Sequence, residues 1–348
     1  MAVFLGSLVA SLAATPVAKR VALRLGFVDR PGGRKIHAVV TPYLGGVAIY
    51  IGFVGAVVSV VGFDLRLIHQ SASLLAGATL LLILGLWDDR SGMSPRVKLA
   101  GQFVAALIVI ASGIRLQLTG HFLLDVPLSV LWIVGLSNAI NLSDNMDGLS
   151  SGLVAISGAA LFVLAAAGGQ FLVASMAAAL GGACLGFLRY NFSPASIFMG
   201  DAGSLFLGFT LAVLALKLRL AHPEPTATVI LVLVTAMPIL DTTLVTVYRW
   251  AHGRPVYVGG QDHCSHRLVA LGLSRRAAVL TLYSLAAGFG GLAVALDRST
   301  AKAGWVLTVV AVLAAFLVFL KLGSVAVYGP KAPARTPASA DERSSQTS

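Results

Sequence analysis

Apolar stretches of about 14 to 22 residues alternate with short polar stretches along nearly the whole chain. A helix needs roughly 20 mostly apolar residues to cross a bilayer, and somewhat fewer where charged flanks reach the interface. The pattern therefore predicts an all-α integral membrane protein with about eleven transmembrane helices. We expect these helices near residues 1–14, 43–62, 71–87, 99–114, 126–141, 150–167, 171–188, 203–220, 226–247, 277–296 and 303–321.

Composition excludes a water-soluble globule. Of the 348 residues, 57% are hydrophobic and 11% are charged, whereas soluble proteins carry roughly 25% charged residues. The mean hydropathy is +0.89. Cys184 and Cys264 are the two cysteines, which is too few to indicate a disulfide framework. Basic residues follow the first apolar stretch rather than preceding it, so we expect no cleavable signal peptide.

The net charge of +11 is best explained by membrane topology, and we expect no nucleic-acid partner. Of the 25 Lys and Arg residues, 19 lie in the tail or in loops after the odd-numbered predicted helices. The positive-inside rule then places the N-terminus outside and the C-terminus in the cytoplasm of a plasma (inner) membrane protein. The six basic residues of the other loops are Arg66, Arg115, Lys217, Arg219, Arg298 and Lys302.

Two parts of the chain differ in composition. We expect residues 1–322 to form one polytopic transmembrane domain. Residues 323–348 are poor in large apolar side chains and rich in Pro, Ser and Ala, which predicts a disordered cytoplasmic tail.

Polar residues that topology does not require gather in the predicted cytoplasmic loops. Half of the fourteen acidic residues lie there or close by, namely Asp88, Asp89, Asp144, Asp147, Asp201, Asp241 and Asp262. Grouped carboxylates repel one another unless a cation lies between them, and Asp and Asn oxygens suit Mg²⁺ or Mn²⁺. Lys and Arg of the same loops would contact phosphate oxygens. The residues predict a metal-dependent site for a phosphorylated substrate at the cytoplasmic surface.

Each segment also has a purely structural interpretation. Asp88-Asp89 suits a helix cap, and Met199-Gly200-Asp201 suits a turn that opens a helix. Asn141, Asp144 and Asp147 would share one helix face. His263 and His266 have the spacing of a zinc pair but lack further ligands at a useful spacing. Asp241, inside an apolar segment, is either functional or orients a neighbouring loop.

Taken together, the motifs of these loops resemble those of a known family. The chain resembles the polyprenyl-phosphate N-acetylhexosamine-1-phosphate transferases (glycosyltransferase family 4), within the bacterial undecaprenyl- or decaprenyl-phosphate N-acetylglucosamine-1-phosphate transferase branch. The matching segments are Asp29-x-Pro-x-x-Arg-Lys35-x-His, Pro42-x-x-Gly-Gly, Asp88-Asp89 with Lys98, Asn141-x-x-Asp144-x-x-Asp147-Gly-Leu, Asn191-Phe-x-Pro-Ala-x-Ile-Phe198-Met-Gly-Asp201-x-Gly-Ser, and His263-x-x-His266-Arg267.

The resemblance implies a reaction. A polyprenyl phosphate attacks the β-phosphate of a UDP-N-acetylhexosamine and gives polyprenyl-pyrophosphoryl-sugar and UMP, with Mg²⁺ as cofactor (Mn²⁺ as a substitute). This is the first membrane step of a cell-envelope glycan. The expected partners are therefore the nucleotide sugar, the lipid phosphate and the bilayer, and a homodimer stays open.

Residue roles also follow from the resemblance. Asp201 is expected to be the main Mg²⁺ ligand with help from Asn141, while Asp88 resembles the carboxylate that activates the lipid phosphate and Asp89 its positioning partner. The remaining expected substrate-binding residues are Lys98 for a phosphate, Asp144 and Asp147 near the metal and uridine, Phe198 on uracil, His263, His266 and Arg267 over the sugar and pyrophosphate, and Lys35.

Departures from the family pattern bear on the donor. Asn145 replaces a frequent Gly, and because Asn tolerates a left-handed backbone we expect the turn to survive. The muramoyl-pentapeptide branch carries three consecutive histidines in the loop of His263 and a Lys-Gly before Thr41-Pro42, where this chain has Val39-Val40. The pattern favours a UDP-N-acetylglucosamine-like donor over the muramoyl-pentapeptide donor.

Two other classes stay open. A secondary transporter would place ionisable residues near mid-bilayer, whereas here the acids lie at one surface. An inactive scaffold or lipid-binding protein has no need of Asp88, Asp89, Lys98, Asn141 and Asp201 together.

Overall fold

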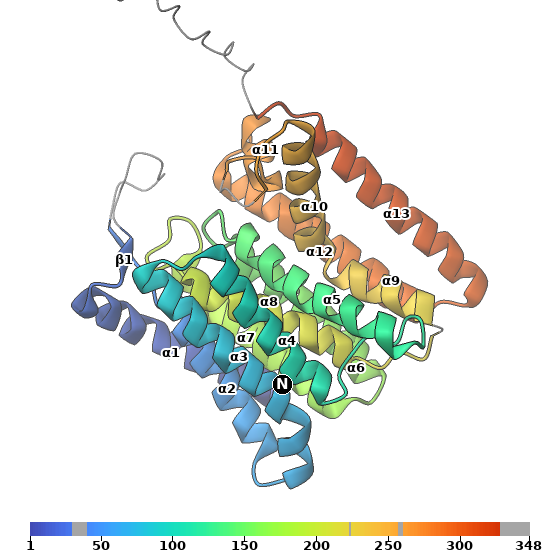
Figure 1. Ribbon diagram of the computed structural model, residues 1–348, viewed down its shortest axis with the longest axis horizontal. Helices are drawn as coiled ribbons and strands as arrows, with labels where there is room; N and C mark the ends of the chain where they lie inside the picture. The colour runs from blue at the N-terminus through green and yellow to red at the C-terminus, as the bar shows by residue number, and fades with distance from the viewer. Residues whose placement is uncertain (30–39, 223, 257–259, 328–348) are drawn as a thin grey trace, which may run out of the picture.

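The computed structural model describes residues 1–29, 40–222, 224–256 and 260–327. These residues form thirteen α-helices and two two-residue strands (Figure 1). The elements are α1 (Ala2–Leu25), β1 (Val28–Asp29), β2 (Thr41–Pro42), α2 (Gly45–Val61), α3 (Leu65–Ser91), α4 (Pro95–Ala111), α5 (Phe122–Ser143), α6 (Leu149–Ala167), α7 (Phe171–Asn191), α8 (Gly200–Lys217), α9 (Glu224–Val234), α10 (Ala236–Ala251), α11 (Cys264–Ala270), α12 (Arg275–Asp297) and α13 (Ala301–Gly323).

Membrane-spanning helices dominate the fold, as the apolar pattern predicts. Eight of the described helices are long and apolar enough to cross a bilayer, and a bent pair raises this to nine. Each of the eleven predicted segments coincides with a helix or, in one case, with this pair. α2 and α4 have 17 residues each, whereas the eight span-length helices have at least 18. The all-α membrane class is therefore confirmed, while the count of eleven spans stays a prediction.

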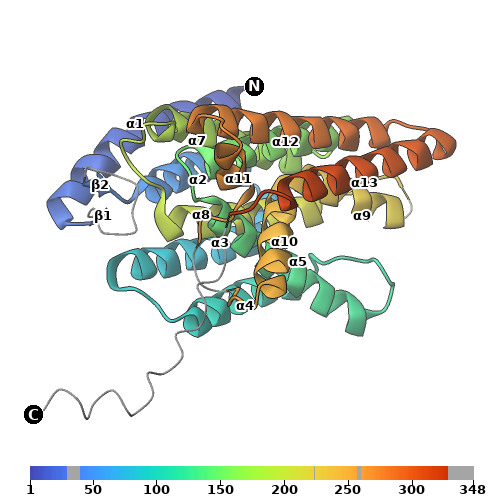
Figure 2. The same ribbon diagram turned by 90° about the horizontal axis from the view of Figure 1, so that it is seen from above.

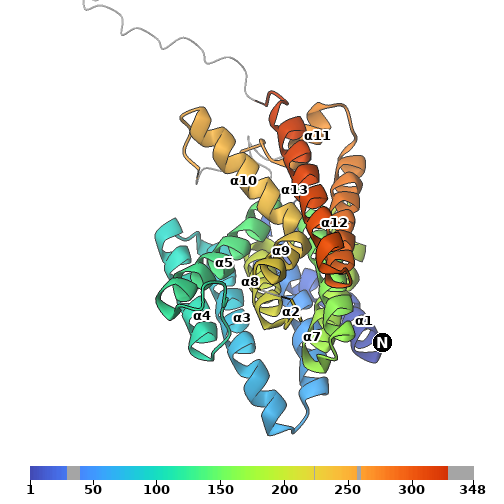
Figure 3. The ribbon, with the colours of Figure 1, turned by 90° about the vertical axis from the view of Figure 1, so that its right-hand side faces the viewer.

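The prediction of one continuous helix over residues 226–247 is wrong. The chain bends by 82° between the two helices of this segment, α9 and α10. Pro238 favours the break, because its ring nitrogen has no hydrogen to donate to the carbonyl of Val234 and a proline suits the first turn of a new helix. Figure 3 shows α10 leaving the end of α9 and projecting beyond the α1–α8 group.

The helices form two neighbouring groups. α1–α8 pack together, and α9–α13 lie along one side of them (Figure 1), where α12 contacts α6 and α9. α12 and α13 run back along each other at the outside (Figure 2). α8 is the central helix, since nearly all of its residues are buried and it contacts α2, α3, α5, α6 and α7.

Glycines allow the central helices to come very close. A Cβ atom on Gly46 of α2 would collide with the backbone nitrogen of Gly203 in α8, and one on Gly85 of α3 would collide with the backbone of Ala202. The Gly-Gly pair at 45–46 therefore serves helix packing, as small residues do where lipid supplies no hydrophobic drive. This close approach fixes the start of α8 against the end of α3.

Candidate active site

Four helices place one polar residue each around a common centre. The centre lies where α3 and α5 end and where α4 and α8 begin. The Lys98 Nζ lies 2.6 Å from Asp201 Oδ2, 3.0 Å from Asp88 Oδ2 and 3.3 Å from Asn141 Oδ1. The structure thus brings together four predicted site residues that the sequence separates by up to 113 positions.

The side chain of Asn141 links this centre to the interior. Its Nδ2 donates to Asp201 Oδ1 at 2.6 Å and to the buried Ser204 Oγ at 2.8 Å, while its Oδ1 faces Lys98. Ser204 belongs to the Asp201-x-Gly-Ser segment but is not among the predicted site residues. Ser204 lies three residues after Asp201 on a helix, so both side chains lie on one face. This spacing is the sequence signal that identifies Ser204 as a neighbour of the site.

Asp89 holds the start of α8. Its two carboxylate oxygens accept hydrogen bonds from the backbone N–H groups of Asp201 at 2.7 Å and Ala202 at 3.1 Å. A carboxylate at a helix N-terminus satisfies unpaired N–H groups and meets the positive end of the helix dipole. Gly200, with φ of 69°, leaves room for it, since a Cβ there would collide with Asp89 Oδ2. This geometry agrees with the role of positioning partner, whereas a catalytic role of Asp89 stays a prediction.

The Pro42-x-x-Gly-Gly motif supports the same loop from the other side. The backbone N–H groups of Gly45 and Gly46 donate to the carbonyls of Phe198 and Met199 at 2.9 and 3.0 Å, and the Phe198 N–H donates to Pro42 at 2.9 Å. The motif therefore fixes the backbone that leads into Asp201. Its glycines are needed for close approach, not for chemistry.

Asp144 and Asp147 follow Asn141 but have different surroundings. Asp147 Oδ2 accepts a hydrogen bond from the Ala195 N–H at 2.9 Å and so holds the α7–α8 loop. The half-buried Asp144 carboxylate makes no hydrogen bond with the residues that the structure describes. Desolvation, followed by the charges of Asp201, Asp89 and Asp147, raises the pKa of Asp144 to about 8. Such a carboxylate gains stability from a nearby cation.

The donor set around Lys98 fits a hard divalent cation. Asp88, Asp201 and Asn141 direct oxygen atoms toward one point, and Mg²⁺ typically takes one or two protein carboxylates and leaves its other positions to water and substrate phosphates. In the structure the Lys98 ammonium provides the positive charge at that point. Within the described ranges, no three His, Cys, Asp or Glu side chains form a ready-made metal cage. The two acids and the amide therefore fit Mg²⁺ as part of a site that substrate completes.

The histidine loop is held by a buried acid. Asp241 Oδ2 lies 2.8 Å from His263 Nδ1, and Asp241 Oδ1 accepts a hydrogen bond from the Cys264 N–H at 2.6 Å. Asp241 thus orients the neighbouring loop, which is the milder of the two interpretations of this residue. Burial, helped by the neighbouring His263, lowers the pKa of His266 to about 4, so this ring is neutral at physiological pH.

One hydrogen bond ties this loop to the acidic centre. Ser265 Oγ donates to Asn145 Oδ1 at 2.6 Å, and Asn145 is the residue next to Asp144. The turn at Asn145 survives, but not through the left-handed backbone that we expected. Among the described residues, Leu44 is the one non-glycine with a positive φ. Asn145 instead uses its amide to join the α5–α6 turn to α11.

Arg267 is fully buried and binds the end of another helix. Its Nε donates to the Asp262 carbonyl at 2.8 Å, and its Nη1 donates to the carbonyls of Leu322 at 3.0 Å and Val325 at 2.9 Å. The guanidinium carbon also lies 4.1 Å from the centroid of the Tyr248 ring. The structure therefore gives Arg267 a structural role in capping α13, and contact with a nucleotide sugar stays a prediction.

The structure says less about the remaining predicted site residues. Phe198 is half-buried, and its ring lies 6.0 Å from that of Tyr43, so its stacking on uracil stays a prediction. Lys35 lies outside the described residues. Tyr43 itself was missed, although it is inside the Pro42-x-x-Gly-Gly motif. Burial and the neighbouring Asp29 raise the pKa of its phenol, which keeps it protonated beside the centre.

The fold and this geometry define a class, namely a polytopic membrane protein with a lysine–carboxylate centre at one end of its helix bundle. The family model of glycosyl transferase family 4 matches residues 71–219, the part that carries Asp88, Lys98, Asn141 and Asp201. Similar proteins with curated names cover more of the chain, and together these matches settle the family. The chain belongs to glycosyl transferase family 4.

Three of these relatives show the range of similarity. A protein of Bacillus subtilis (strain 168), named probable undecaprenyl-phosphate N-acetylglucosaminyl 1-phosphate transferase, is 38% identical over 85% of this chain and 85% of its own. A decaprenyl-phosphate N-acetylglucosaminephosphotransferase of Mycobacterium tuberculosis is 34% identical over 78% and 76%. An undecaprenyl-phosphate alpha-N-acetylglucosaminyl 1-phosphate transferase of Escherichia coli (strain K12) is 28% identical over 86% and 84%.

Proposed function

We propose that this protein transfers N-acetylglucosamine-1-phosphate from UDP-N-acetylglucosamine to a polyprenyl phosphate, giving polyprenyl-pyrophosphoryl-N-acetylglucosamine and UMP. The observation that carries the proposal is the centre of Asp88, Lys98, Asn141 and Asp201 at the end of a membrane bundle. A lipid phosphate reaches that level from the bilayer, and a nucleotide sugar reaches it from water. The names of the relatives supply the sugar and the lipid class.

The reaction exchanges one phosphorus–oxygen bond for another. An oxygen of the lipid phosphate attacks the β-phosphorus of the nucleotide sugar, and the bond from that phosphorus to the bridging oxygen breaks as UMP leaves. Phosphoryl transfer of this kind depends on positioning and charge neutralisation more than on covalent chemistry with the protein. Asp201 and Asn141 would hold Mg²⁺, which when bound supplies positive charge to the phosphate oxygens.

The charged and polar side chains of the protein then have different roles. The Lys98 ammonium contacts three acceptor oxygens in the structure. A phosphate oxygen that binds beside Lys98 would accept part of this hydrogen bonding. Asp88, 3.0 Å from Lys98 Nζ, orients that ammonium. A phosphate monoester is largely ionised at pH 7, so the attacking oxygen needs little help from a general base. Asp89 and Asn145 act indirectly, by fixing α8 and the histidine loop.

We place this site on the cytoplasmic side of the plasma membrane. The support is the asymmetry of 19 against 6 basic residues between the two sets of loops. UDP-sugars are polar solutes that cannot cross lipid, so the donor must reach the site from the compartment in which it is made.

A purified-protein assay tests the proposal. Protein in detergent, undecaprenyl phosphate and Mg²⁺ are combined separately with UDP-N-acetylglucosamine, UDP-N-acetylgalactosamine, UDP-glucose and UDP-muramoyl-pentapeptide, and the released nucleotide is identified. We expect UMP from UDP-N-acetylglucosamine or its close N-acetylhexosamine relative, and little from the pentapeptide donor. Comparable turnover of the pentapeptide donor would overturn the assignment of the sugar, and release of UDP would overturn the reaction type.

A further inference from the structure

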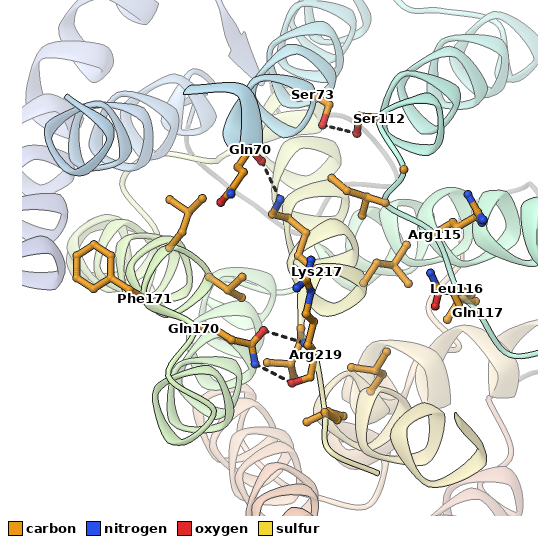
Figure 4. Close-up of a pocket in the computed structure, with 18 of the residues that line it drawn as sticks. Gln70, Ser73, Ser112, Arg115, Leu116, Gln117, Gln170, Phe171, Lys217 and Arg219 are labelled. Carbon is orange, nitrogen blue, oxygen red and sulfur yellow. Dashed lines mark hydrogen bonds between the residues drawn. The ribbon is translucent and has the colours of Figure 1, made fainter. Parts of the chain in front are cut away.

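A second polar region lies at the other end of the bundle. A cavity of about 1050 Å³ is lined by the first turns of α3 and α7, the last turns of α8, the linker after α4 and part of α9 (Figure 4). Gln70 in the cavity wall precedes Asp88 by 18 residues on α3, which is roughly 27 Å of helix at 1.5 Å per residue. The cavity is therefore separate from the centre around Lys98.

Its charged lining is almost entirely basic. Arg66, Arg115, Lys217 and Arg219 line it, together with His69. Among the described residues of the lining, Asp64 is the one acid, and its Oδ1 accepts hydrogen bonds from the N–H groups of Arg66 and Leu67 as the cap of α3. None of the four Lys and Arg side chains forms an ion pair with a described acidic residue.

In the structure, these Lys and Arg side chains use only part of their hydrogen-bond donors. Lys217 Nζ donates to the Gln70 carbonyl at 2.7 Å, while Arg219 is held through its backbone, which exchanges two hydrogen bonds with the Gln170 amide. Figure 4 shows the Lys217 and Arg219 side chains next to each other in the middle of the cavity. The guanidinium of Arg115 stacks 5.1 Å from the Phe122 ring, and its buried Nε has no hydrogen-bond partner in the described part of the chain.

Nearby acid offsets these charges only in part, because Asp125 acts on Arg115 without forming an ion pair among the described residues. Asp125 lies within electrostatic reach of Arg115, but its Oδ1 accepts hydrogen bonds from both the N–H and the hydroxyl of Thr119, at 2.9 Å each. Lys217 and Arg219 repel each other, because both are cationic and adjacent. Such an arrangement gains stability when an anion lies between the charges.

Membrane topology does not account for these residues. The alternation of loops assigns six basic residues to the side opposite the candidate active site, where the positive-inside rule favours few. Four of the six line this single cavity, and the other two, Arg298 and Lys302, lie outside it. Their convergence therefore needs a reason other than orientation in the membrane.

We infer that this cavity binds a phosphate group, and that its natural ligand is the phosphate head group of a membrane lipid. Lys and Arg side chains that project from several elements suit phosphate oxygens, which accept several charge-assisted hydrogen bonds at once. The wall also carries apolar side chains, among them Phe171, Leu220 and Leu231, and Phe171 is 68% exposed. Apolar side chains do not stabilise a free anion, whereas the acyl chains of a lipid pack against them.

Lipid binding by the purified full-length protein tests the inference. Native mass spectrometry measures the dissociation constants of phosphatidylglycerol, of zwitterionic phosphatidylcholine and of inorganic phosphate. The test variant is Arg66→Gln with Arg219→Gln, because both side chains are exposed and their replacement should leave the fold intact. The matched control is Arg298→Gln with Lys302→Gln, which removes the same charge from exposed positions of the same predicted side.

We expect wild-type protein and the control to bind phosphatidylglycerol more tightly than phosphatidylcholine. A cation near a membrane surface contributes a factor of about five to binding of anionic lipid, so the test variant should lose roughly thirtyfold. Binding of inorganic phosphate that the test variant alone loses, without preference for the anionic lipid, would support the phosphate site and identify a soluble ligand. Equal binding of both lipids with no phosphate binding, or equal losses in both variants, would overturn the inference.

Discussion

At the scale of single residues, Lys98 is the charge that holds the candidate site together. Two carboxylates, those of Asp88 and Asp201, lie within 3.0 Å of its ammonium, and the side chain of Asp201 is 31% exposed. Removing one of these carboxylates changes both the ligand set and the balance of charge. The consequences are largest for Asp201, because it also accepts from Asn141.

Asp201→Asn should lower the rate of UMP release by at least roughly a hundredfold, equivalent to about 2.7 kcal/mol. A neutral amide is a weaker Mg²⁺ ligand than a carboxylate, and it leaves Lys98 with one fewer anionic partner. EDTA should likewise abolish wild-type activity, and added Mg²⁺ should restore it. The control is Asp64→Asn at the opposite end of α3, where Asn remains a good helix cap. Near-wild-type turnover by Asp201→Asn would remove it as the main ligand.

At the scale of elements, the site depends on how closely α2, α3 and α8 approach one another. Asp89 of α3 and the Gly45-Gly46 pair of α2 both contact the first turn of α8 or the loop before it. The position of Asp201 is therefore set by the Asp89 carboxylate and by glycine contacts that leave no room for a side chain. Substitution of a single glycine can test this without touching any polar group.

Gly46→Ala should destabilise the protein by about 1–3 kcal/mol and reduce activity, because the new methyl group collides with Gly203. Gly55→Ala is the matched control in the same helix, since a Cβ there meets nothing within 4 Å. Alanine is the better helix former, so this control should be neutral or slightly stabilised. Thermal unfolding in detergent measures both variants. Equal stability of the two would contradict the packing account.

Arg267→Ala should lower the free energy of unfolding by about 3 kcal/mol, since it removes a buried cation that binds four backbone carbonyls. Arg275→Ala, at an exposed position at the start of α12, should leave the unfolding midpoint unchanged. Thermal unfolding and UMP release are measured together. An unchanged midpoint with a ten- to hundredfold loss of turnover would instead support direct contact with the donor.

These elements show which features the sequence could predict. Long apolar runs identify the helices because lipid demands them, and the spacing of Asn141, Asp144 and Asp147 marks the site because clustered acids at a helix end are unusual. The bend before α10 escaped prediction, since Pro238 lies in a mostly apolar run that is long enough for one membrane span. The role of Arg267 also escaped, because the carbonyls around the end of α13 that it binds lie 55 or more residues away, and no residue type reveals a backbone acceptor.

At the scale of the whole molecule, the two polar regions lie at opposite ends of the same helices. The candidate active site uses the ends of α3 and α5 and the starts of α4 and α8, and the basic cavity uses the other ends of α3 and α8. An orientation across the membrane therefore assigns each region to one compartment. The positive-inside rule predicts the cytoplasm for the active site.

Single cysteines should confirm this orientation. Native Cys184 and Cys264 are buried, so we expect little background labelling from them. Ser91→Cys, beside Asp88 and exposed, should react with a membrane-impermeant maleimide only in inverted vesicles. Thr300→Cys, exposed between α12 and α13, should react only in intact cells. The reverse pattern, or labelling of both from one side, would contradict a common cytoplasmic site.

The most direct test of the central claim follows the β-phosphate of the donor. UDP-N-acetylglucosamine labelled with ³²P at that phosphate is incubated with undecaprenyl phosphate, Mg²⁺ and the protein, and the lipid and water phases are separated. We predict that the label enters the lipid phase in equal amount to the UMP released, and that Asp201→Asn transfers it at least roughly a hundredfold more slowly. Label that stays in water as UDP, while sugar enters the lipid, would contradict transfer of a sugar phosphate.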